Sequence, residues 1–129
     1  MIKGLEGILL FSAKPGRLAR FYADKVGLKI TLEAETGEKG EEMYGFEFES
    51  GSNLYILNHS RITGKNKNPE RMMFNLEVSD IESSVKKLER GGVKKIADTY
   101  HMQDYGYIAT FEDPDGNYFQ LVQVKSPEE

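Results

Sequence analysis

Hydrophobic positions along this 129-residue chain follow two periods, one typical of helices and one typical of strands. Apolar residues at helical spacing follow Pro15 and stop at Gly27, and a second helical stripe follows Asp80 and stops at Gly91. Runs with a period of two predict strands around each helix. The predicted strands are GILLF, 28–35, MYGFEFE, NLYILN, MFNLEV, 93–99, YGYIATFE and NYFQLVQ.

The two halves of the chain repeat one another. The segment that starts at Gly7 aligns with the segment that starts at Met73, 66 positions later, and each half reads strand, helix, strand, strand, strand. One half alone cannot bury its sheet, so we expect an α+β fold in which two βαβββ modules curve their sheets together and share a core. The expected bounds are one domain over 1–129, with module 1 at about 4–59, a linker at about 60–70 and module 2 at about 71–125, and a loose C-terminal SPEE.

Local signals mark the start of each helix. Pro15 suits a first helical turn, because its missing N–H has no partner there in any case. Ser79 and Glu82 match the S-x-x-E capping box, and Asp80 suits the positive end of the helix dipole. The sequence therefore predicts that the second helix begins at this box.

The segment DPDG, from Asp113 to Gly116, predicts a hairpin corner. Pro114 presets the backbone for a type I turn, and Gly116 accepts the positive φ that follows. A calcium loop is the chemical alternative. Counting from Asp113, however, an EF-hand would require glycine at Tyr118 and glutamate at Val124. The acidity of the turn is therefore expected to be structural.

Composition bounds the function. Hydrophobic residues are 39% and charged residues 29%, as in a globular protein, and cysteine is absent, which excludes disulfides, thiolate nucleophiles and Cys-based zinc sites. No apolar stretch could span a bilayer and no signal peptide is seen, so we expect a cytoplasmic protein that binds no membrane. The net charge of −4 disfavours nucleic acid. The acidic segment Glu33–Glu49 is either a solvated hairpin or a rim that attracts a cationic ligand.

The repeat, the FY pair in the first helix, VSD before the second, and the terminal FEDPDGNYFQLVQ resemble the vicinal oxygen chelate superfamily. This superfamily includes glyoxalase I, extradiol dioxygenases, fosfomycin-resistance enzymes and bleomycin-resistance proteins. The resemblance covers nearly the whole chain. It implies that each module curves its mixed sheet into half of a cup, that the concave side of the cup holds a ligand or metal, and that the protein is a homodimer.

The resemblance also implies four places for metal ligands, and this chain departs from the pattern there. The places fall on Gly7, Met73, Gln120 and, with the register open by one residue, Tyr55 or Ile56. Only Gln120 is a usual donor for a divalent ion, so no metal and no other cofactor are expected. The alternative is a nonstandard site built from His59, His101 in the loop YHMQDYG, and Gln120, with Glu77 as the carboxylate.

Strand alternation separates the concave face from the face under the helices. The residues predicted to line the ligand site are Leu9, Phe11, Asn53, Tyr55, Met73, Asn75, Glu77, Tyr118 and Gln120. They suit a small organic molecule held by stacking and a few hydrogen bonds, although the same residues could fill a closed core. Glu77 could pair with a cationic ligand, act as a general base, or form a structural salt bridge.

The function expected from the sequence is a metal-independent small-molecule binding protein of the bleomycin-resistance type, which sequesters a cationic or aromatic compound. The alternative is a metal-dependent glyoxalase-type lyase, isomerase or dioxygenase with atypical ligands, or a metal-free relative that uses Glu77 as its base. A third possibility is an interaction module whose cup is closed.

Overall fold

The computed structural model describes residues 1–36 and 40–125, which fall into two compact units, Met1–Gly64 (unit 1) and Lys65–Glu129 (unit 2). Each unit contains one four-stranded mixed sheet and one main helix, which confirms the predicted α+β fold. The predicted loose C-terminus at 126–129 lies outside the described residues. Within the described part of the chain, no helix combines the length and the apolar character needed to cross a membrane.

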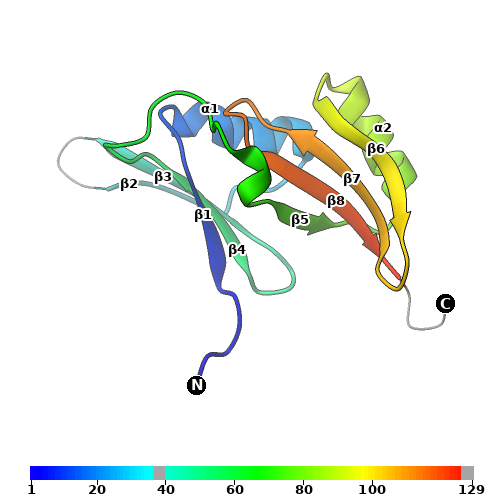
Figure 1. Ribbon diagram of the computed structural model, residues 1–129. Helices are drawn as coiled ribbons and strands as arrows, with labels where there is room; N and C mark the ends of the chain where they lie inside the picture. Colours follow the sequence, from blue (N-terminus) through cyan, green and yellow to red (C-terminus); the bar gives the residue numbers. More distant parts are fainter. Residues whose placement is uncertain (37–39, 126–129) are drawn as a thin grey trace. The chain divides into compact units, whose positions relative to one another are not determined.

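Unit 1 consists of β1 (Gly7–Phe11), α1 (Pro15–Arg20), the π-helix η1 (Phe21–Val26), β2 (Leu32–Thr36), β3 (Glu41–Glu47) and β4 (Asn53–Leu57). Its sheet has the order β1-β4-β3-β2 (Figure 1). The first strand runs parallel to the last one, and the other pairs are antiparallel.

Unit 2 consists of the 3-10 helix η2 (Pro69–Arg71), β5 (Phe74–Glu77), α2 (Ile81–Arg90), β6 (Lys94–Met102), β7 (Gly106–Glu112) and β8 (Tyr118–Val124). Its sheet order, β5-β8-β7-β6, and its strand directions reproduce those of unit 1. The sequence repeat is therefore a repeat of topology.

The helix ends follow the sequence signals with one correction. Pro15 starts α1, and Gly27, at φ 93°, ends the helical segment. The predicted capping box at Ser79 is wrong by one residue, because Asp80 is the N-cap of α2 and its Oδ1 accepts a hydrogen bond of 3.3 Å from the Ser83 N–H. Asp80 has an extended backbone, with φ −139°, which places its carboxylate over the first turn.

Each helix buries one face of the sheet in its own unit. In unit 1 the core consists of Leu18, Ala19, Tyr22, Phe46, Leu54 and Ile56. In unit 2 the rings of Phe74, Phe119 and Phe111 stack in series, with centroids 6.1 and 6.0 Å apart, and α2 adds Ile81, Val85 and Leu88 to the buried residues. Full burial of a leucine, isoleucine, valine or phenylalanine side chain contributes about 1.5–3 kcal/mol.

The DPDG segment is a hairpin corner, as predicted. Asp113 is 4% exposed, and its Oδ1 accepts hydrogen bonds from the backbone N–H groups of Asp115 and Asn117 at 2.9 and 3.0 Å. Its Oδ2 accepts a third from Asn117 Nδ2 at 3.0 Å. Because both oxygens face N–H donors, this carboxylate orders the corner and does not present itself to a calcium ion.

Candidate functional site: the open sheet faces

We call the sheet face opposite α1 the open face of unit 1, and the sheet face opposite α2 the open face of unit 2. In β4, Leu54 and Ile56 are buried on the α1 side, so Asn53, Tyr55 and Leu57 lie on the open face. Strand pairing places Leu9 beside Tyr55 in unit 1 and Asn75 beside Gln120 in unit 2. Leu9 and Asn75 are equivalent positions in the repeat. The residue of β4 that corresponds to Gln120 is therefore Tyr55 and not Ile56.

The ring of Tyr55 lies against two glycines on the open face of unit 1. A β-carbon added to Gly7 would lie 2.7 Å from Cε2 of Tyr55, and one added to Gly45 would lie 3.5 Å from Cδ1. In the sheet, Gly7 of β1 pairs with Asn53 of β4, and Gly45 of β3 pairs with Tyr55 of β4. The ring is therefore held close to the sheet, and it occupies the space that a side chain at position 7 would need.

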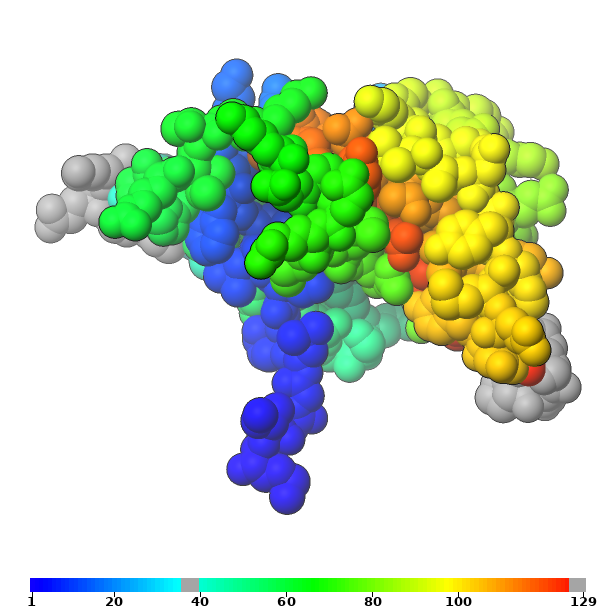
Figure 2. All heavy atoms as spheres, viewed as in Figure 1, coloured from blue at the N-terminus to red at the C-terminus, as the bar shows by residue number. Residues whose placement is uncertain are grey.

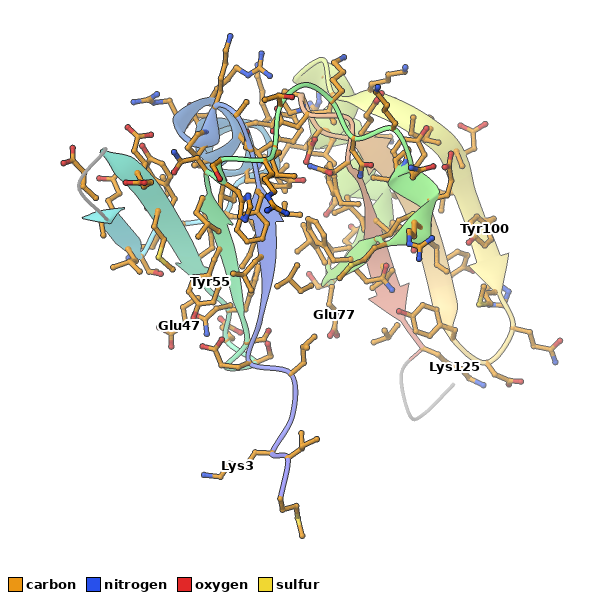
Figure 3. The ribbon with its side chains drawn as sticks, turned by 60° about the vertical axis from the view of Figure 1, so that its left-hand side comes forward. Lys3, Glu47, Tyr55, Glu77, Tyr100 and Lys125 are labelled. Carbon is orange, nitrogen blue, oxygen red and sulfur yellow. The ribbon has the colours of Figure 1, made fainter. Side chains whose placement is uncertain are left out.

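Glu6 holds the hydroxyl end of this tyrosine. Tyr55 Oη donates a hydrogen bond of 2.6 Å to Glu6 Oε2, and Asn53 Nδ2 donates another of 3.2 Å to the same oxygen. The hydrogen bond to Glu6 raises the pKa of Tyr55, with further contributions from desolvation and from the negative charges of Glu6 and Glu47. Figure 3 labels Tyr55 and Glu47 at the same end of the sheet. Glu6 was missed in the sequence because it precedes the alternating strand pattern.

The rest of this face is apolar and accessible. Leu9, Leu32 and Phe11 are 52%, 43% and 37% exposed. Phe11 makes an edge contact with His59, with ring centroids 5.4 Å apart, and His59 Nδ1 accepts a hydrogen bond of 3.1 Å from the Arg61 N–H. The first residues of the chain, drawn in dark blue, project away from the body of unit 1 (Figure 2). An exposed apolar surface with a hydrogen-bonded tyrosine can stack an organic ligand.

The open face of unit 2 carries a polar row that crosses three neighbouring strands. We call Asn75 on β5, Gln120 on β8 and Thr110 on β7 the amide row, because Gln120 is paired with both of the others. Gln120 Nε2 donates a hydrogen bond of 2.9 Å to Thr110 Oγ1. The next row along the sheet is Glu77, Val122 and Ile108, in which only Glu77 is exposed. Figure 3 shows Glu77 at the end of β5.

Tyr105 reaches the amide row from the β6–β7 turn. Its Oη accepts a hydrogen bond of 3.1 Å from Asn75 Nδ2, and its carbonyl accepts one of 2.7 Å from the Lys125 N–H. Because β8 and β7 lie between β5 and the turn, the Tyr105 side chain must extend across the open face. Tyr107, two positions later, lies on the α2 side, since the neighbouring Ile108 is on the open face.

His101 does not lie in a loop near Gln120, and this expectation is corrected. Strand β6 continues to Met102, and His101 pairs with Tyr107, which places it on the α2 side of the sheet. Its ring contacts Tyr107 with centroids 4.9 Å apart. Among residues 1–36 and 40–125, no group of three or more His, Cys, Asp or Glu side chains could hold a metal ion.

The chemistry of the four family ligand places does not fit a divalent metal. Gly7 has no side chain, and Met73 offers a soft thioether. The Tyr55 phenol donates a hydrogen bond to Glu6 and its pKa is raised, which disfavours the phenolate that a metal would need. Gln120 is the remaining candidate, and a single neutral amide does not hold such an ion.

The predicted site residues are distributed over the two open faces. Strand positions place Leu9, Phe11, Asn53 and Tyr55 on the open face of unit 1, and Asn75, Glu77, Tyr118 and Gln120 on that of unit 2. Met73 immediately precedes β5 in the same alternation as Asn75, and it is 40% exposed. Their role in binding stays a prediction.

Solved structures with the same fold include an antibiotic binding protein, a fosfomycin resistance protein and a glyoxalase I. TnmS3, an antibiotic binding protein from a Streptomyces species, is 19% identical, with 96% of this chain and 98% of that chain covered and a TM-score of 0.76. The fosfomycin resistance protein FosX from Listeria monocytogenes is 17% identical, with 99% and 98% covered and a TM-score of 0.74. Glyoxalase I from Leishmania major is 16% identical, with 95% and 87% covered and a TM-score of 0.76.

These identities show the fold alone, and a search of curated proteins finds no match. The sequence model of one family does match, over residues 4–121. The chain therefore belongs to the Glyoxalase/Bleomycin resistance protein/Dioxygenase superfamily.

Proposed function

We propose that this protein binds a small organic molecule on its open sheet faces without a metal ion and without transforming the ligand. The observation that carries the proposal is the donor set at the four family ligand places. A glycine, a thioether, a neutral amide and a hydrogen-bonded phenol replace the usual His and Glu ligands. What these positions offer instead is stacking surface and hydrogen bonds.

The composition of the open faces supports this proposal. Exposed Leu9 and Phe11 supply apolar contact, whereas Asn53, Asn75 and Gln120 supply directional polar groups. Organic ligands are usually held by such a mixture of many apolar and few polar contacts. The antibiotic binding protein TnmS3 has the same fold, which is compatible with a sequestering role. A cup formed by the two modules and a homodimer complete the proposal as family expectations, and a cytoplasmic location is part of it as an expectation from the sequence.

A thermal-shift screen tests the proposed function. The protein would be screened in the presence of EDTA against cationic, neutral and anionic aromatic compounds, and we expect at least one cationic or neutral compound to raise the Tm. Leu9→Ser should weaken the binding of that compound. Ile62→Ser is the matched control, because Ile62 is 40% exposed but lies outside both sheets. The absence of any hit, or a hit that needs added metal, would contradict the proposal.

Glu77 supports a second candidate, a metal-free enzyme that uses this carboxylate as a general base. Glu77 is exposed on the open face of unit 2, and in the described part of the chain it has no hydrogen-bond or ion-pair partner. The structural salt bridge weighed for it from the sequence is not seen there. Analysis of the bound compound by mass spectrometry separates the two candidates, since sequestration returns it unchanged.

A further inference from the structure

We infer that the open face of unit 2 recognises a planar cation that carries N–H donors, such as an amidinium or guanidinium group. The inference rests on the proposed function, because it specifies the chemical class of ligand for one of the proposed binding faces. Three features carry it: the free acceptors of the amide row, the carboxylate beside them, and an aromatic ring placed by a specialised turn.

Each of the two amides uses one N–H group within the protein. Asn75 Nδ2 donates to Tyr105 Oη and Gln120 Nε2 donates to Thr110 Oγ1, at 3.1 and 2.9 Å. Within residues 1–36 and 40–125, the carbonyl oxygens Asn75 Oδ1 and Gln120 Oε1 receive no hydrogen bond. Each can therefore accept one from a ligand.

The Glu77 carboxylate lies in the next row of the same face. It follows Asn75 by two residues on β5, so the two side chains project on the same side, with backbones about 7 Å apart. Glu77 also has no partner among the described residues. The face thus offers two free amide oxygens and one negative charge as acceptors, and it suits a cationic group that donates hydrogen bonds.

The turn before β7 is shaped to place the Tyr105 ring on this face. Asp104 has φ 67°, a left-handed conformation that is unusual for a residue with a side chain, and Gly106 has φ 144°. A β-carbon on Gly106 would collide with the Gln123 carbonyl oxygen. Two unusual backbone positions therefore flank Tyr105, whose own carbonyl is tied to the Lys125 N–H. Such backbone conformations persist where the surrounding structure fixes them.

These features together select a planar N–H donor. An amidinium or guanidinium group presents a flat fork of N–H donors that pairs with a carboxylate and with amide oxygens, and its plane stacks on an aromatic ring. A quaternary ammonium group has the charge without the N–H groups. A carboxylate ligand would be repelled by the negative charge of Glu77.

A titration of the 15N-labelled full chain followed by NMR tests the inference, with benzamidine as the probe. We expect saturable shifts centred on Asn75, Glu77, Tyr105 and Gln120, with a Kd on the order of 1 mM for so small a molecule. Glu77→Gln should weaken binding about tenfold, as loss of a charge-assisted hydrogen bond does. Tyr105→Leu should weaken it through loss of the stacking ring. Glu82→Gln, an exposed position on α2, is the control and should leave the Kd unchanged.

Matched probes decide the chemical class. Phenyltrimethylammonium tests charge without N–H donors, and benzoate tests the opposite charge. The inference is overturned if either binds as tightly as benzamidine, if Glu77→Gln binds benzamidine normally, or if other compounds raise the Tm while benzamidine produces no shifts on this face. If no compound of any class binds, the proposed function itself fails, which is a different result from binding with the wrong selectivity.

Discussion

The ring of Tyr55 lies on the α-carbon of Gly7, so that a β-carbon at position 7 would be 2.7 Å from Tyr55 Cε2 and 2.9 Å from the Asn53 carbonyl oxygen. Both residues occupy family places for metal ligands. Here the Tyr55 ring fills the space that a side chain at position 7 would occupy. A histidine at position 7 would require the Tyr55 ring to move.

Gly7→Ala should therefore destabilise the protein. We expect a loss of about 1–3 kcal/mol in the free energy of unfolding, because the new methyl group meets both a ring and a backbone oxygen in a packed sheet. Gly45→Ala is the graded control, since its nearest neighbour is a side-chain atom, Leu32 Cβ, at 3.1 Å. Urea denaturation measures both variants. A larger loss for Gly45→Ala would contradict the close approach at Gly7.

Glu6→Gln should lower the pKa of Tyr55 toward its ordinary value of about 10. The wild-type pKa is raised by the hydrogen bond to Glu6, and the substitution removes the negative charge while leaving an acceptor oxygen. NMR titration of labelled tyrosine rings measures the shift. An unchanged pKa would show that Glu6 does not hold the phenol in solution.

The hydrogen bond between Tyr55 and Glu6 also contributes to the pH dependence of the free energy of unfolding. A pKa raised in the folded state means that the fold favours the protonated phenol. The stabilisation is then fully present below the unfolded pKa of about 10 and is lost as the pH rises through the folded pKa. The difference in stability between wild type and Tyr55→Phe should accordingly be constant near neutral pH and should shrink in strong alkali. A difference in stability between the two proteins that grows with rising pH would contradict a raised pKa for Tyr55.

Asp113→Ala should cost about 2–4 kcal/mol, because three N–H donors at a buried corner lose their acceptor. Asp113→Asn keeps one acceptor oxygen and should cost less. Thermal unfolding in buffer with and without calcium compares the variants. Stabilisation of the wild type by calcium would contradict the structural role of this carboxylate.

Gly106→Ala should cost about 3 kcal/mol or more, since its positive φ and the Gln123 carbonyl leave no room for a β-carbon. Asp104→Asn is the control in the same turn, because asparagine tolerates the left-handed conformation, and we expect a change within about 0.5 kcal/mol. Denaturant unfolding measures both. Equal effects of the two substitutions would show that the turn is not held at Gly106.

The fold was predictable from the sequence because its signals are local and repeated. The alternation in GILLF and NYFQLVQ, the helix stop at Gly27 and the DPDG corner each depend on residues within a few positions. The capping box failed by one residue because Ser79 and Asp80 are both good caps, and only the extended backbone at Asp80 decides between them.

The candidate site was harder to predict because its contacts are between distant segments. The choice between Tyr55 and Ile56 depends on the pairing of β1 with β4, and the Glu6 contact spans 49 positions. His101 looked like a loop residue because Asp104 and Gly106 signal a turn close behind it, yet β6 continues through two register shifts to Met102. Tyr105 reaches Asn75 over 30 positions, and no local pattern encodes that approach.

Metal stoichiometry tests the central claim most directly. The protein would be incubated separately with Ni²⁺, Zn²⁺, Mn²⁺ and Fe²⁺, freed of loosely bound ions by gel filtration, and measured by elemental analysis alongside Gln120→Leu. We predict that wild type and variant alike retain only substoichiometric metal, because Gly7, Tyr55, Met73 and Gln120 supply no adequate donor set. One ion per chain in the wild type, lost in Gln120→Leu, would contradict the claim.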